Sequence, residues 1–193
     1  MTTAPQPLEN VFARAWALLQ RNWIIIVPGI VIGIAVGVIH ALLQPSFAVV
    51  QGEDPSATLL RASHSVGTVF IMTCVGLLAF IATQAYTTGM AGAAWQRGTA
   101  TLADGSAAFQ HDAGRILMVA IGLIVLAIVA AILAIPTLGT ALIAYYLFCL
   151  YSFPAAIVGN APGWSGITES FRIAAARFVP TLIVGVMIFV ISL

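Results

Sequence analysis

Charged and apolar residues are segregated into long blocks along this chain. No Asp, Glu, Lys or Arg occurs in residues 22–52, 62–96, 116–168 or 178–193. A helix that crosses a bilayer needs about 20 apolar residues, because each residue adds 1.5 Å to a hydrocarbon path of about 30 Å. The first three blocks are therefore long enough for at least one crossing helix, whereas the last block is short.

These blocks predict five spanning helices. The first two blocks hold one span each, at residues 24–43 and 66–86. The third block is too long for one helix, and the Pro and Gly of its IPTLGT stretch predict a break between spans at 115–135 and 138–158. The fifth span, 179–193, is incomplete, so we expect either a helix that stops at the chain end or a longer protein with a sixth span.

Three of the predicted spans follow a short segment of mixed polarity. Residues 7–21 place apolar side chains at the i, i+3 and i+4 spacing of one helical face. The other two segments, residues 106–114 and 166–177, each follow a side chain that can cap a helix. The candidate caps are Asp104 or Ser106 for the first of these and Ser165 for the second. We predict that all three segments are short amphipathic helices in the membrane interface.

Each of these segments ends at or immediately before an arginine, namely Arg21, Arg115 or Arg177. An arginine at this place keeps its guanidinium among lipid headgroups while its stem lies along apolar surface, so we expect an elbow there. The spacing Phe-x5-Arg at 109–115 and 171–177 favours an internal repeat, although the first copy departs from it. The alternative is that the arginines flank spans only to set the topology.

The arginines also predict an orientation. All seven basic residues are arginines. If the N-terminus is cytoplasmic, the alternating spans leave only Arg61 outside, and the positive-inside rule favours this arrangement. The cytoplasmic arginines are then Arg14, Arg21, Arg97, Arg115, Arg172 and Arg177. The loop at residues 44–65, which carries Glu53 and Asp54, lies outside.

The composition supports a bilayer environment. Hydrophobic residues make up 61% of the chain and charged residues 7%, whereas a soluble domain carries about 25% charged residues. The formal net charge of +1 provides no basic footprint for nucleic acid. We therefore predict an all-α integral membrane helical bundle in the inner (plasma) membrane. Residues 1–193 form one domain with about five visible transmembrane helices plus the short interfacial helices.

Small residues recur four apart on two of the spans. In lipid, such rows let two helix backbones approach closely. The rows are Gly29, Gly33, Gly37 and Ala41 on the first span, and Ala85, Gly89 and Ala93 on the second. We expect them to join spans of one chain, with contact between protomers as the alternative. On this interpretation Gly33→Leu loosens the bundle.

Few polar groups fall inside the spans. His40 and His64, with the acidic residues between them, are candidates for an external metal or proton site, but their spacing matches no ligand motif. Gln84 and its neighbouring threonines make a polar end to the second span, which suits hydrogen bonds between helices or a polar pathway. No nucleophile–base pair is visible. We therefore assign no catalytic residue, metal or cofactor, and we expect no enzymatic activity.

Three stretches of the chain together resemble a known family. They are ARAWALLQRNWIIIVPGI, TTGMAGAAWQRGTATLADGSAAF and YSFPAAIVGNAPGWSGITESFRIAAARF. In them the chain is similar to the polytopic bacterial family related to the membrane domain attached to glycerophosphoryl diester phosphodiesterases. The resemblance is carried by Arg21, Asn22, Gly89, Arg97, Gly98, Pro154 and Ser170. It implies a six-span bundle with both ends cytoplasmic and a largely unassigned function. Asn160 departs from the acidic residue expected there, and no phosphodiesterase domain is present.

Two functions fit these observations. The first is a non-enzymatic membrane module that contacts lipids, partner proteins or a second copy of itself, which the near absence of buried charge favours. The alternative is a transporter or permease-like subunit for a small solute, which the helix packing and the polar groups of the second span favour. The lack of charge inside the spans disfavours only ion-coupled transport.

Overall fold

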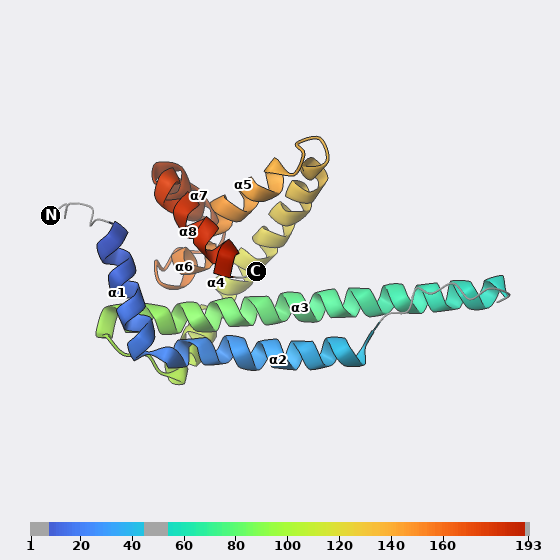
Figure 1. The fold of residues 1–193 in the computed structure, drawn as a ribbon, viewed down its shortest axis with the longest axis horizontal. Coiled ribbons are helices and arrows are strands. Elements are labelled where there is room, and N and C mark those ends of the chain that lie inside the picture. Colours follow the sequence, from blue (N-terminus) through green and yellow to red (C-terminus); the bar gives the residue numbers. More distant parts are fainter. Residues whose placement is uncertain (1–7, 45–53, 192–193) are drawn as a thin grey trace. The chain divides into compact units, whose positions relative to one another are not determined.

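The computed structural model describes residues 8–44 and 54–191, and within them the chain is all α-helical, without strands (Figure 1). The predicted all-α class is confirmed. The contacts divide the chain into two compact units, where the sequence led us to expect one domain. Unit 1 comprises Met1–Ile25 and Gln84–Leu193, and unit 2 comprises Ile26–Thr83.

Helix α1 (Leu8–Arg21) opens unit 1 and agrees closely with the predicted amphipathic helix at 7–21. It ends at Arg21, where the elbow was predicted, and a 3-10 turn, η1 (Trp23–Ile26), follows. The last α1 carbonyls have no partner within the helix, as at every helix C-terminus. Asn22 is buried, and both its backbone amide and its Nδ2 donate to the Leu18 carbonyl at 2.9 Å, which anchors the side chain at the helix end.

Helix α3 (Pro55–Arg97) is longer at both ends than the predicted span at 66–86. Its sequence contributes to unit 2 up to Thr83 and to unit 1 from Gln84 onwards. No proline follows Pro55 before Arg97, and Gly67, Gly76, Gly89 and Gly92 all keep helical backbones. Nothing in the sequence between these ends therefore stops the helix.

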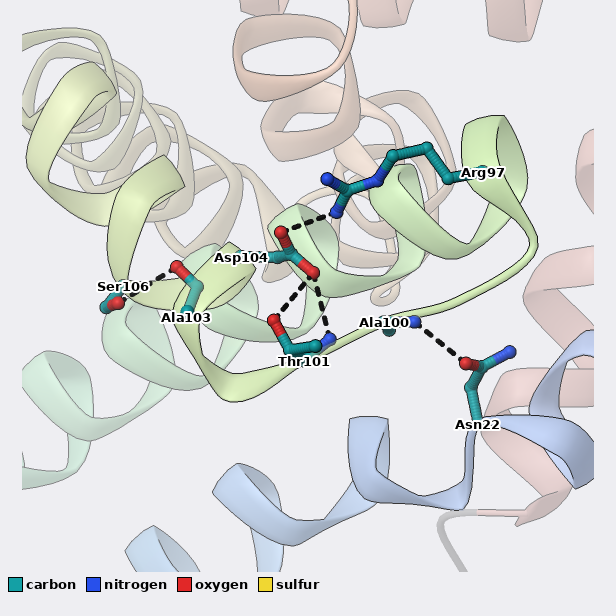
Figure 2. Close-up of polar contacts among 7 residues, drawn as sticks. All are labelled: Asn22, Arg97, Ala100, Thr101, Ala103, Asp104 and Ser106. Atoms are coloured by element: carbon teal, nitrogen blue, oxygen red, sulfur yellow. Dashed lines mark hydrogen bonds and ion pairs between the residues drawn. The ribbon is translucent and has the colours of Figure 1, made fainter.

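The prediction of a second surface helix is wrong, because helix α4 (Leu102–Ala134) runs without a break. Residues 106–114 are not a separate element, and no elbow occurs at Arg115, because one uninterrupted helix contains both the polar segment and the predicted span. The helix begins at a capping box between Thr101 and Asp104 and meets no proline before Ala134. Ser106, a predicted cap, lies inside the first turns and donates to the Ala103 carbonyl (Figure 2).

Helices α5 (Thr140–Cys149) and α6 (Ser152–Ile157) occupy the predicted span at 138–158, which is therefore broken rather than continuous. The predicted hairpin between this segment and α4 is present. Its turn uses Gly139 in the left-handed region, with φ of 84°, which glycine adopts without steric cost. Pro154 accounts for the break, because it cannot donate to the carbonyl four residues earlier and its ring crowds that carbonyl.

Helices α7 (Ser165–Ala176) and α8 (Phe178–Ile191) match the third predicted pair of surface helix and span. They meet at Arg177 with a bend of 108°. Ser165 is the first residue of α7 rather than its cap, and its hydroxyl donates to the Pro162 carbonyl. Of the three predicted arginine elbows, the bend at Arg177 is the clearest.

Unit 1 is held together by close approaches at glycines. A Cβ on Gly89 would overlap the Ala108 methyl and approach the Asp104 carbonyl oxygen to 3.2 Å, and a Cβ on Gly105 would overlap the Tyr86 ring. Helices α3 and α4 therefore pack backbone to backbone at this point. In the same way, a Cβ on Gly122 of α4 would overlap the side chains of Ile167 on α7 and of Trp164 just before α7.

Unit 2 contains α2 (Val27–Leu42) and the first part of α3. In the predicted small-residue row of α2, Gly29 packs against Thr83 of α3, since a Cβ on Gly29 would lie 3.6 Å from Thr83 Cγ2. At Gly33 and Gly37 an added Cβ would meet no described atom within 4 Å. Within unit 2, the described residues therefore offer no contact at Gly33 that a leucine would disturb.

We expect Gly89→Leu to lower the melting temperature in detergent and Gly33→Leu to leave it unchanged. The first substitution forces a side chain against α4 backbone that cannot move aside, which costs about 1–3 kcal/mol. The second enters open space. Thermal unfolding of both variants followed by circular dichroism is the measurement. Equal melting temperatures for the two variants would contradict the packing described for α3 and α4.

Candidate functional site

A polar clamp joins the end of α1 to the loop after α3 within unit 1. Asn22 donates from Nδ2 to the Gly98 carbonyl at 3.2 Å. Its Oδ1 accepts the Ala100 amide at 2.8 Å, as Figure 2 shows. Gly98 has a φ of 80°, which suits glycine after a helix end. Near by, the Arg14 guanidinium lies 4.2 Å from the centre of the Trp95 ring and donates to the Trp95 carbonyl at 3.2 Å. The clamp fixes the polar end of α3.

Asp104 connects the same loop to the start of α4. Its carboxylate accepts from Arg97 at 2.5 Å and from both the amide and the hydroxyl of Thr101 at 2.9 Å (Figure 2). The hydrogen bond from Arg97, followed by that from the Thr101 amide, holds the pKa of the Asp104 carboxyl below its ordinary value of 3.8. Asp104 thus fixes the helix start rather than acting as a proton carrier at neutral pH.

Arg115 makes a second charged cluster at the open end of the α4 hairpin. Its Nη1 donates to Asp112 at 2.7 Å and to the Asn160 side-chain oxygen at 2.9 Å. Asp112 is 5% exposed, so the arginine compensates a carboxylate that would be costly to bury alone. Asn160 adopts a φ of 53°, a left-handed conformation that asparagine tolerates better than most residues. The residue expected to be acidic is thus a neutral acceptor for Arg115.

A cavity of about 280 Å³ lies between these two clusters. Small residues of α3 and α4, together with Ile157 and Val158, form its apolar wall. Its polar wall is formed by Gln96, Arg97, Asp104, Asp112 and Asn160. Each of its carboxylates is already paired with an arginine. The cavity therefore offers neutral polar contacts more than an unbalanced charge.

The break between α5 and α6 is completed by a serine from α7. Ser170 is fully buried, and its hydroxyl donates to the Phe148 carbonyl at 2.6 Å and accepts the Tyr151 amide at 3.0 Å. These are backbone groups that the broken helix leaves without partners in its own ladder. The Tyr151 hydroxyl also lies 3.3 Å from Thr181 Oγ1 on α8. By contrast, the buried Ser152 hydroxyl has no hydrogen-bond partner among the described residues.

A larger cavity of about 650 Å³ adjoins this break. Its apolar walls include Ala155, Val158 and Ile173, and its polar edge is formed by Trp95, Tyr151, Ser165, Thr168, Glu169 and Arg172. Gly92 and Val158 line both cavities, so only a thin wall separates them. The larger cavity has the size of a small-molecule site, with few polar groups along an otherwise apolar surface.

The speculative site at His40, His64 and Gln84 is not assembled by the structure. His40 lies 3.4 Å from the Met72 carbonyl on α3, and His64 is eight residues earlier on that helix. Eight residues correspond to about 12 Å along a helix, so the two imidazoles do not meet. No group of three His, Cys, Asp or Glu side chains in the described residues could hold a metal ion. Gln84 belongs to unit 1, and Glu53 lies outside the described residues.

Sequence reasoning found the arginines but missed most of their partners. Four of the six predicted cytoplasmic arginines make specific contacts within unit 1, to Trp95, Asp104, Asp112 and Glu169. Asp112 carries a local signal, since it lies three residues before Arg115 on one helical face. The partners Asn160 and Phe148 are far along the chain from Arg115 and Ser170, and no local pattern indicates them.

Comparison of the chain with protein-family models, with curated proteins and with solved structures finds no match.

We expect Ser170→Ala to destabilise the protein and Ser152→Ala to be neutral or slightly stabilising. The first variant leaves the Phe148 carbonyl and the Tyr151 amide buried without partners, at a cost of about 1–3 kcal/mol. The second removes a buried hydroxyl that has no partner among the described residues. The two serines are matched in size and burial. A greater loss of melting temperature in the Ser152 variant would contradict the role assigned to Ser170.

We also expect acid to weaken the fold partly through Asp104. Because the folded-state pKa lies below 3.8, ionised Asp104 contributes stability above that pH, and the contribution is lost as the pH falls through the folded-state pKa. Asp104→Asn keeps a cap acceptor but does not titrate. Its melting temperature should therefore fall less steeply than that of the wild type between pH 5 and pH 2. Parallel slopes for the two proteins would contradict this assignment.

Proposed function

We propose that the chain is a multi-pass integral membrane protein. The observation that carries this proposal is the exposure of its apolar helices. In the described residues, four helices have the length and hydropathy of a membrane span, or five if the bent pair α7–α8 counts as one. Within the protein, only 6%, 0%, 33% and 33% of the four apolar windows are buried. Water does not tolerate contiguous apolar surface on this scale, whereas lipid covers it.

The orientation proposed for this protein places the N-terminus in the cytoplasm. Six of the seven arginines belong to unit 1, and the seventh, Arg61, to unit 2. The contact between Arg115 and Asn160 brings the start of one predicted span beside the end of the next. This pairing supports a common side for the arginine-bearing ends, and the positive-inside rule makes that side cytoplasmic.

The biochemical role we propose is that of a non-enzymatic module that contacts lipid at this arginine-bearing end. Among the described residues, neither the cavity of about 650 Å³ nor that of about 280 Å³ has side chains arranged as nucleophile and base, and the carboxylates of both are paired with arginines. Such a surface supports binding better than it supports chemistry. We also propose that the chain belongs to the family it resembles. Residues that carry the resemblance have structural roles here: the clamp uses Asn22 and Gly98, the close helix packing uses Gly89, and the helix break uses Pro154 and Ser170.

A permease-like subunit is the second candidate, and the broken helix α5–α6 favours it. Transporters place their substrate sites at discontinuous helices, where backbone groups are released from the helical ladder. The Ser152 hydroxyl beside the break, which has no hydrogen-bond partner in the part of the chain that the structure describes, is the polar group such a site would use. A solute-flux screen in liposomes that contain the purified protein separates the two functions. Uptake specific for one solute would contradict the binding-module proposal.

We expect the protein to stay in the membrane fraction after washing with alkaline carbonate, and its orientation to follow from cysteine labelling. Both native cysteines, Cys74 and Cys149, are first replaced by serine. Ala57→Cys should then react with a membrane-impermeant maleimide in intact cells, and the matched variant Ala103→Cys only after lysis. The reverse pattern would contradict the orientation, and release of the protein by carbonate would contradict membrane integration.

A further inference from the structure

The cavity of about 650 Å³ in unit 1 combines an apolar wall with one charged pair. The pair is Glu169 and Arg172 on α7, whose Oε1 and Nη2 atoms lie 2.6 Å apart. The Arg172 side chain is 76% exposed and that of Glu169 is 34% exposed, so both retain accessible hydrogen-bonding atoms. An exposed pair of this kind contributes little to stability, and its position at a cavity edge calls for another explanation.

The charges at this edge select for a particular ligand. An anion attracted by the Arg172 guanidinium would also be repelled by the Glu169 carboxylate. A cation attracted by Glu169 would likewise be repelled by Arg172. A zwitterion whose two charges lie close together satisfies both side chains at once. Beyond the pair, Val158, Ile173 and Ala155 provide apolar surface for the part of the ligand that carries no charge.

We propose that this cavity binds the headgroup region of a zwitterionic phospholipid, with the phosphate on Arg172 and the amine on Glu169. The inference rests on the proposed membrane location and deepens it by naming the lipid class. The bend of 108° between α7 and α8 supports it. If α8 enters the bilayer, such a bend turns α7 towards the plane of the membrane surface, which is the depth of the headgroups. Lipid is the chosen ligand because a free headgroup would leave the apolar wall without a partner.

The test measures lipid adducts on the purified protein in detergent by native mass spectrometry. Phosphatidylethanolamine and phosphatidylglycerol with identical acyl chains compete in one mixture, and glycerophosphoethanolamine serves as the headgroup without chains. We expect the wild type to prefer phosphatidylethanolamine by about fivefold, the scale of one exposed charge pair. The chain-free headgroup should bind far more weakly than the lipid.

Single substitutions should change the preference in opposite ways. Glu169→Gln leaves Arg172 unopposed, so the preference should shift to the anionic phosphatidylglycerol. Arg172→Gln removes the phosphate partner, so adducts of both lipids should decrease, with those of phosphatidylglycerol decreasing most. Arg61→Gln is the matched control, because this arginine belongs to unit 2 and does not line the cavity. Melting temperatures of all variants establish that the fold is kept.

Several outcomes would overturn the inference. They are a wild-type preference for phosphatidylglycerol, equal binding of the chain-free headgroup, or the same adduct pattern in the Glu169 and Arg172 variants as in the Arg61 control. A protein that resists carbonate but shows no headgroup preference contradicts this inference alone. A protein that carbonate releases contradicts the proposed function as well.

Discussion

The fold requires hydrogen-bond partners for the backbone amides and carbonyls that are left unpaired where helices end or break inside apolar surroundings. A buried amide or carbonyl without a partner costs about as much as a whole hydrogen bond contributes, and 61% of this chain is hydrophobic. Ser170 meets this demand at the break between α5 and α6, and Asn22 meets it in the loop after α3, where it binds the Gly98 carbonyl and the Ala100 amide. Each is a single polar side chain that reaches a segment distant in the sequence. The long-range arrangement of unit 1 follows from these few contacts.

Glycine and alanine allow the second feature of the structure, the close approach of helix backbones. Gly89 and Gly105 bring α3 and α4 together, and Gly166 lets α7 approach Val119 and Ala156. Close approach then sets the geometry of the charged clusters, because it places Arg97 beside Asp104 and carries Asn160 to Arg115. The two cavities lie on either side of a wall that Gly92 and Val158 form. Packing and candidate site are thus consequences of the same small residues.

The three arginine-bearing segments show how similar sequences reach different structures. The segment before Arg177 ends in a bend of 108°, and the segment before Arg21 ends its helix at that arginine. The segment before Arg115 continues without interruption, because the Thr101–Asp104 capping box starts a helix that no proline ends. The spacing of Phe and Arg alone does not decide between these outcomes. What decides is whether the following residues keep their helical hydrogen bonds.

The sequence by itself determined the all-helical class, the places of the α4–α5 turn and of α1 and α7, and the segregation of charge to segment ends. These follow from local rules of hydrophobic length, helical spacing and glycine in a turn. The continuity of α3 and α4 and the break at 138–158 also have local causes, namely the absence of proline, the Thr101–Asp104 capping box and Pro154, which the predicted element boundaries did not include. Only the tertiary structure decided which partners Arg115, Asn22 and Ser170 find. The physical reason is that these outcomes depend on contacts between residues tens of positions apart. The energy of such a contact is absent from any local window of sequence.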